Sequence, residues 1–166
     1  MSVAALARKA GVSRASFYLH FDSAEELGLT ALSELFDFIV DTSLDRLQQD
    51  HASQYDVSRI AFSEVAAFVA EHPRFYTQLI GPGAAPTFIQ AAVDTLAEQI
   101  LASLQAMDMP TRVDLAFASR FFAYGALGMV GTWLASGAEK PHDTLAQDIV
   151  DCLPAWLVGA DIPSER

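Results

Sequence analysis

The chain has 166 residues, of which 52% are hydrophobic, and it carries a formal net charge of −11. This composition excludes a disordered chain and provides enough apolar material for one large domain, or for a small domain followed by a larger one. The acidic balance also argues against a protein that binds nucleic acid over most of its surface, because such a protein needs an excess of lysine and arginine.

The charges are unevenly distributed along the chain. Residues 1–21 contain three basic residues and no acidic residue, whereas residues 22–50 contain eight acidic residues and one basic residue. The split suits a small basic head on an acidic body, in which only the head approaches a phosphate backbone. A chance cluster of three charges would give the same count, so the pattern needs the support of a motif.

The residue pattern predicts an all-α fold, because alanine and leucine dominate and alternating β-branched runs are missing. The first two helices are short. Ser2 is the candidate N-cap of a helix over residues 3–10, which Gly11 ends in a left-handed conformation, and Ser13 caps a second helix over residues 14–20. This is the spacing of a helix-turn-helix, whose second helix lies in the major groove of DNA.

A long amphipathic helix follows. Ser23 and Glu26 form a capping box, and apolar residues recur at helical spacing from there toward Gln49. After a polar break, capping residues, prolines and glycines predict further helices. They cover residues 56–71 with Asp56 as the cap, 74–80 after His72 and Pro73, 87–107, from the cap Thr111 to near Gly137, and 143–157.

One predicted helix is apolar all round. Residues 116–135 are twenty residues with Arg120 as the only charge, which is close to the length that spans a bilayer. A charge in lipid is costly, and no lysine or arginine cluster flanks either end. We therefore expect a helix that is buried on both sides in a protein without membrane contact.

The N-terminal motif resembles that of a known family. Residues 3–32 read VAALARKAGVSRASFYLHFDSAEELGLTAL, which closely resembles the helix-turn-helix of the TetR family of bacterial transcriptional regulators. The matching positions are Ser2, Val3, Leu6, Ala7, Ala10, Gly11, Val12, Ser13, Phe17, Tyr18, His20, Phe21, Ser23, Glu25 and Leu27. The resemblance implies a homodimeric repressor that a small-molecule effector releases from double-stranded operator DNA. It implies a DNA-binding region with the start of the connecting helix over residues 1–45, and a ligand-binding and dimerisation domain over residues 46–166.

The start of the second helix holds the candidates for DNA contact. Arg14, Ala15 and Ser16 are the candidates for base edges, where Arg14 suits a guanine and Ala15 a thymine methyl group, while Ser13 and the free amides of the helix start suit a phosphate. The resemblance adds Tyr18 and His20 as phosphate contacts. The alternatives are ordinary surface for the first residues and a structural hydrogen bond to the turn for His20.

A small core is expected to fix the angle between the two short helices. Its predicted members are Val3, Leu6, Ala7, Ala10, Val12, Phe17 and Phe21.

The motif departs from the family pattern in two places. Ala24 stands where the family usually has a lysine, and the first of the family's three head helices would lie upstream of Ser2. We expect an upstream segment to supply that helix, because the head stays close to the pattern. The alternative is a dimeric sensor or protein-interaction module of the same fold whose DNA binding is impaired.

The resemblance further implies a ligand pocket between the body helices and a dimer interface on the last two helices. The pocket candidates are Phe62, Phe88, Phe117, Arg120, Phe121 and Tyr124, of which the aromatic residues are equally typical of a core. The interface candidates are Gly125, Gly128, Trp133, Ile149, Leu153 and Trp156, for which packing within the chain is the alternative. A structural ion pair of Arg120 with Asp114, Glu64 or Glu98 is preferred over a ligand contact.

The sequence contains no motif that favours an enzymatic function. The four histidines are scattered, no metal-binding histidine motif appears, and the loop at Gly81 lacks the lysine of a phosphate-binding loop. We expect neither a cofactor nor a metal. The single Cys152 and the lack of a signal-peptide pattern predict a cytoplasmic protein.

Overall fold

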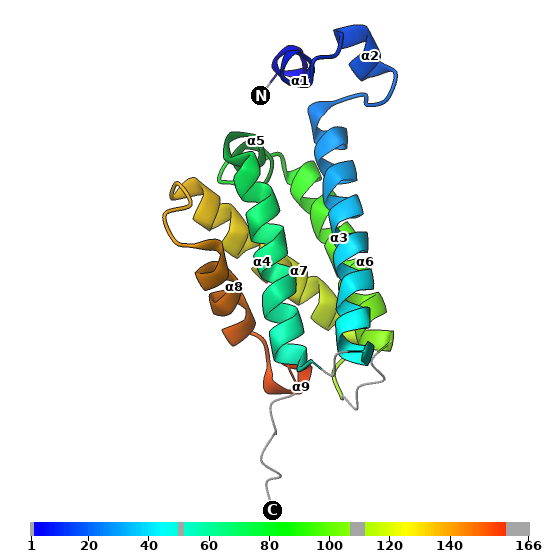
Figure 1. Cartoon of the computed structure of the whole chain (residues 1–166), viewed down its shortest axis with the longest axis vertical. Helices are drawn as coiled ribbons and strands as arrows, with labels where there is room; N and C mark the ends of the chain where they lie inside the picture. The colour runs from blue at the N-terminus through cyan, green and yellow to red at the C-terminus, as the bar shows by residue number, and fades with distance from the viewer. Residues whose placement is uncertain (1, 50–51, 107–111, 159–166) are drawn as a thin grey trace, which may run out of the picture.

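The computed structural model describes residues 2–49, 52–106 and 112–158, which form helices and contain no strand, as the sequence predicts. Two short helices form a head at one end of the molecule, and the longer helices pack beneath it (Figure 1). The helices are α1 (Val3–Lys9), α2 (Arg14–Tyr18), α3 (Ala24–Gln49), α4 (Gln54–Glu71), α5 (Pro73–Ile80), α6 (Pro86–Ala106), α7 (Leu115–Ala135), α8 (His142–Asp151) and α9 (Ala155–Val158).

Local hydrogen bonds set the turn of the head. Gly11 has φ +71°, the left-handed conformation that glycine adopts without steric cost, and the Val12 amide donates to the Ala7 carbonyl at 3.0 Å. The Ser13 hydroxyl then accepts from the Ser16 amide at 3.0 Å and caps α2. The predicted turn and both predicted caps of the head are confirmed, since Ser2 also accepts from the Ala5 amide.

Helix α3 connects the head with the body. The Ser23 hydroxyl accepts from the Glu26 amide at 3.0 Å, so the predicted capping box opens this helix. From there α3 descends along the body beside α4 and α6 (Figure 1), burying Leu32, Phe36 and Ile39. One rigid rod therefore runs from the end of the head to the far end of the body.

The body core lies between α3, α4, α5, α6, α7 and α8. A glycine allows especially close packing there. A Cβ atom on Gly28 would meet the Leu79 side chain at 2.5 Å, which brings the start of α3 onto α5. Ala66 and Val69 on α4 and Val93 on α6 are each 0% exposed, so these three residues lie at the centre of the core.

Several predicted helix ends differ from the structure. Ser53, not Asp56, caps α4, because its hydroxyl accepts from the Asp56 amide. Asp114 caps α7 through the Ala116 amide, while Thr111 lies outside the described residues. The predicted last helix is two helices, since Pro154 has no amide proton to continue the first one.

Helix α7 crosses the back of the body and buries one side against α5 and α6. Within the described residues, we find no helix with the length and hydropathy required to cross a bilayer. The apolar character of residues 116–135 instead reflects a helix with one side in the core and aromatic residues on its outer side.

Candidate functional site

The six residues predicted to contact DNA lie together at the tip of the head. Ser13, Arg14 and Ala15 are exposed at the start of α2, and Tyr18 and His20 are exposed at its end. Ser16 is half-buried. Phe17 holds the helix in place from its inner side, with 6% exposure and ring contacts to Tyr18 and Phe21. Five of the six residues are thus exposed, while Ser16 and His20 also line the cleft between the head and the body, and contact of the set with DNA stays a prediction.

The predicted small core of the head is only partly closed. Ala7 and Phe17 are buried, whereas Val12 is 45% exposed and Ala10 is exposed. Val3, Leu6 and Phe21 are intermediate. The reason is a cleft of about 620 Å³ between the head and the body, which is lined by Leu6, Ala10, Val12, Phe17 and Phe21 on the head side.

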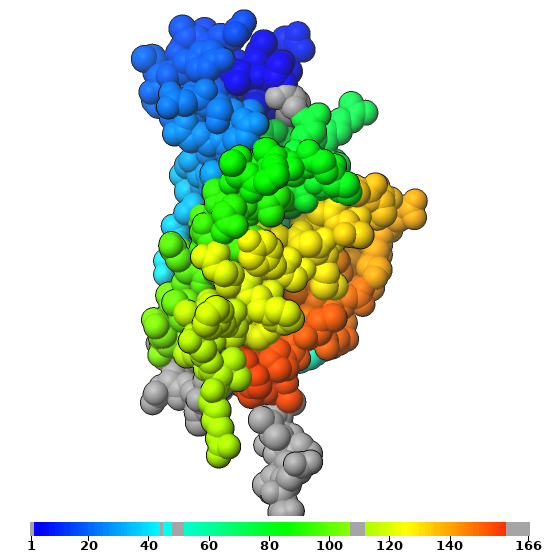
Figure 2. Space-filling view, turned by 180° about the vertical axis from the view of Figure 1, so that it is seen from behind, coloured from blue at the N-terminus to red at the C-terminus, as the bar shows by residue number. Residues whose placement is uncertain are grey.

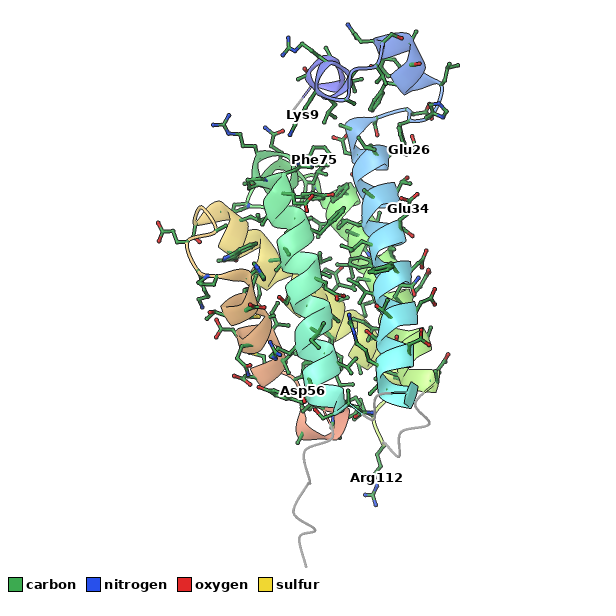
Figure 3. All side chains as sticks on the ribbon, viewed as in Figure 1. Lys9, Glu26, Glu34, Asp56, Phe75 and Arg112 are labelled. Carbon is green, nitrogen blue, oxygen red and sulfur yellow. The ribbon has the colours of Figure 1, made fainter. Side chains whose placement is uncertain are left out.

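The head meets the body across this cleft at few points. Lys9 on α1 approaches His72 at the start of α5, with 3.3 Å between Nζ and Nδ1. Figure 3 shows Lys9 at the lower edge of the head, above Phe75. Phe68, Phe75 and Tyr76 line the body side of the cleft. The continuous helix α3 and this thin contact are therefore what position the head.

A second cavity, of about 150 Å³, lies inside the body. We call it the body cavity. Its walls come from α3, α4, α6 and α7 and from the segment around α9, and they are mainly apolar. The apolar lining consists of Phe36, Ile39, Val40, Ala61, Phe62, Val65, Leu96, Ile100, Leu104, Phe122, Leu153 and Leu157, and the polar lining of Ser43, Ser58, Gln99 and Ser103.

The predicted pocket residues are not brought together here. Phe62 lines the body cavity, but Phe88 is buried in the core at 3% exposure and does not line it. Phe117 and Phe121 are 77% and 74% exposed on the outer side of α7. Phe117 and Phe121 line an open hollow of about 460 Å³ together with Trp156, so a ligand contact at these two residues stays a prediction, whereas the buried Phe88 lines neither this hollow nor the body cavity. Phe122, the next residue along α7, faces the body cavity instead.

Arg120 and Tyr124 also lie outside the body cavity. Arg120 forms an ion pair with Asp94 on α6, with 2.6 Å between Nη1 and Oδ1. The Tyr124 hydroxyl donates to the Gln90 side chain, which also lies on α6, at 2.8 Å. The preferred interpretation of Arg120 as a structural ion-pair residue is correct, but its partner is none of the three that the sequence suggested.

An apolar stripe runs along the exposed side of α7. It consists of Phe117, Phe121, Tyr124, Gly125 and Gly128, and we call it the α7 face. A Cβ atom on either glycine would meet nothing within 4 Å, so both backbones are open to a second molecule. In Figure 2 the yellow surface of α7 lies uncovered in the middle of the molecule, beside α8 and α9.

Two of the predicted interface residues are buried inside the chain. Trp133 is 6% exposed and its Nε1 donates to the Lys140 carbonyl at 2.7 Å, and Ile149 is 3% exposed. Neither is accessible to a partner, because each faces the core, so the prediction is corrected for both. Leu153 is half-buried and lines the body cavity, and Trp156 is half-buried beside Phe122.

The polar residues where α3 packs against α4 were not predicted from the sequence. Ser43 lines the body cavity, and Arg46 on the next turn of α3 pairs with Glu64 on α4, with 2.8 Å between Nη2 and Oε1. A signal was present, because Ser43 and Arg46 continue the buried stripe of Phe36 and Ile39 at helical spacing. These polar residues on an inward stripe place an ion pair next to the body cavity.

Two family models match the chain. The model of the bacterial regulatory proteins of the tetR family matches residues 1–29, and the model of a transcriptional regulator C-terminal region matches residues 59–154. The second match alone covers more than half of the chain. A search of curated protein sequences finds no match.

Solved structures share the fold. FadR from Thermus thermophilus, a TetR family transcriptional repressor in complex with lauroyl-CoA, is 18% identical, with a TM-score of 0.67 over 100% of this chain and 87% of that chain. The fatty acid degradation regulator FadR from Bacillus halodurans is 16% identical, with a TM-score of 0.60 over 95% and 88%. FadR from Bacillus subtilis in complex with stearoyl-CoA is 13% identical, with a TM-score of 0.57 over 98% and 89%.

Proposed function

Because the chain belongs to the TetR family of bacterial transcriptional regulators, we propose that it is a homodimeric repressor whose operator affinity falls when an apolar effector fills the body cavity. One observation carries this proposal. Helix α3 begins four residues after His20, at the end of the head, and its lower half forms a wall of the body cavity through Phe36, Ile39 and Ser43. A change in cavity volume therefore acts on the rod that carries the head.

The exposed start of α2 supports the DNA-binding part of the proposal. Arg14 offers a guanidinium that pairs bidentately with guanine, and the small Ala15 leaves room for a thymine methyl group. Ser16 is the third candidate for a base edge, and Ser13, Tyr18 and His20 are the candidates for phosphate contacts, which set the position of the helix in the groove.

The α7 face supports the dimer. Aromatic rings that are exposed at 77% and 74% on one helix stripe are costly in water, and a second copy of the same stripe would cover them. Gly125 and Gly128 would let the two helices approach closely. The proposed interface keeps these two glycines and Trp156 from the predicted set, and it adds Phe117 and Phe121.

The body cavity supports an apolar effector. Its lining is mainly aliphatic and aromatic, and the structures of similar fold from Thermus thermophilus and Bacillus subtilis hold lauroyl-CoA and stearoyl-CoA. The cavity of about 150 Å³ is smaller than the roughly 300 Å³ at which ligand pockets begin. We propose that a fatty-acyl chain enters by pushing the walls apart, which displaces α3.

A gel-shift titration at several salt concentrations tests the DNA-binding part. The DNA is the intergenic duplex upstream of the gene, and the protein is used both as the 166-residue chain and with an in-frame upstream extension. We expect a complex whose affinity falls steeply with salt, because phosphate contacts release counterions. Absence of a complex with both forms would instead favour the dimeric sensor that does not bind DNA.

A further inference from the structure

Three polar atoms where α3 packs against α4 are buried without a hydrogen-bond partner among the described residues. They are Ser43 Oγ, Arg46 Nη1 and Glu64 Oε2. Arg46 and Glu64 share one hydrogen bond, in which Nη2 donates to Oε1 at 2.8 Å. This bond leaves Arg46 Nη1 and Glu64 Oε2 without a partner. One donor group, one acceptor and one hydroxyl therefore remain free in the same corner of the molecule.

This corner adjoins the body cavity. Ser43 lines the cavity directly, and Arg46 lies one turn further along the same side of α3. On α4, Glu64 lies between Ala61 and Val65, which both line the cavity. Ser58, Gln99 and Ser103 also line the cavity, but the Gln99 side chain donates to Asp37 and the Ser103 hydroxyl donates to the Gln99 carbonyl. The buried polar atoms without a partner among the described residues therefore lie at the Ser43 end of the cavity.

Buried polar groups without partners are rare in native proteins, because burying them costs the hydrogen bonds that they made to water. A ligand that supplies the missing partners would recover this cost. Arg46 and Glu64 carry opposite charges, so the corner is neutral as a whole, and a bare carboxylate would face Glu64 without offering it a proton. The free groups require a neutral ligand group that both donates and accepts.

We infer that the effector carries a carboxamide, which the Arg46–Glu64 corner binds while the alkyl part fills the body cavity. The amide oxygen accepts from Arg46 Nη1, and the amide N–H donates to Glu64 Oε2. Ser43, whose hydroxyl both donates and accepts, completes the contact. This inference rests on the proposed effector cavity and specifies the chemistry of the ligand that it takes.

Calorimetric titration of the full chain with octanamide, methyl octanoate and octanoate tests the inference. The three probes share an alkyl chain, but only the amide both donates and accepts at neutral charge. We expect octanamide to bind about tenfold more tightly than the ester, because the ester leaves Glu64 Oε2 unpaired. In the double variant Arg46→Met/Glu64→Leu the preference should disappear, whereas Lys140→Met/Asp148→Leu, which removes an exposed ion pair, should retain it.

The outcomes separate this inference from the proposed function. Equal binding of amide and ester by the native chain would overturn the carboxamide site and leave the effector cavity standing. A preference that survives in the double variant would also overturn it, since the amide would then be recognised elsewhere. Binding of none of the three probes would overturn both proposals. The comparison of probes on the native chain does not depend on how well the variants fold.

Discussion

A Cβ atom on Gly131 would lie 2.2 Å from the carbonyl oxygen of Ile80, so α7 and the end of α5 pack backbone against backbone. The neighbouring Gly128 has nothing within 4 Å of the same position, because it lies on the exposed side of α7. Two glycines three residues apart in one helix therefore have opposite roles. One is required by the fold, and the other belongs to the proposed dimer interface.

The first prediction follows from this difference. Gly131→Ala should lower the free energy of unfolding by about 2 kcal/mol, because the backbone of Ile80 cannot move aside as a flexible side chain could. Gly128→Ala is the matched control and should raise stability by roughly 0.5–1 kcal/mol, as alanine favours a helix over glycine. Urea denaturation of both variants in a monomeric Phe121→Asp background measures this. Equal stability of the two would contradict the close contact.

The second prediction concerns the α7 face. Phe121→Asp should dissociate the dimer, since it places a charge in the middle of the interface. Phe38→Asp is the matched control, because Phe38 is a phenylalanine with 60% exposure on α3, away from this face. Sedimentation equilibrium should give a monomer for the first variant and a dimer for the second. A native chain that is monomeric at every concentration would refute the interface.

The third prediction concerns base reading by the head. Arg14→Ala should weaken binding of the preferred duplex by about tenfold and flatten the preference between duplexes, because a bidentate guanine contact is worth roughly 1–3 kcal/mol. Arg112→Ala should leave binding unchanged, since Arg112 lies at the opposite end of the molecule (Figure 3). Competition binding with mutated duplexes distinguishes the cases. Unchanged selectivity in Arg14→Ala would remove this residue from the base contacts.

The fourth prediction concerns alkaline pH. Burial, with a smaller contribution from Glu71, raises the pKa of Tyr76 from 10.0 to about 12. Between these two values the unfolded chain loses the phenolic proton while the folded chain keeps it, so stability falls as the pH rises through this range. Tyr76→Phe should make that fall shallower, and an unchanged fall in this variant would contradict the assignment. Denaturation midpoints from pH 9 to about 12 provide the measurement.

Most of the head could be predicted because its features are local. Gly11 adopts the positive φ that the turn needs, and Ser13 and Ser23 cap the helices that follow them. Each of these interactions lies within a few residues of sequence, where the residue type almost determines the conformation. Capping residues, prolines and glycines also predicted most of the body helices. The prediction differs from the structure at the Ser53 cap and at Pro154, where one predicted helix is two.

The sequence could not predict which side of α7 faces the core and which side is exposed. The helix is apolar around its whole circumference, so periodicity does not tell which stripe faces the core. Phe121 was expected in a ligand pocket inside the body and is 74% exposed, whereas Trp133 was expected at the dimer interface and is buried within the chain. The choice depends on tertiary packing against α5 and α6. The same holds for Arg46 and Glu64, which are 18 residues apart in sequence and meet only because α3 and α4 pack together.

The most direct measurement of the central claim is fluorescence anisotropy of a labelled upstream duplex bound to the native chain, titrated with lauroyl-CoA. If filling the body cavity moves the head through α3, lauroyl-CoA should release the duplex, and coenzyme A without the acyl chain should not. Tight binding of lauroyl-CoA by calorimetry with no change in DNA affinity would contradict the claim, because the two sites would then be uncoupled.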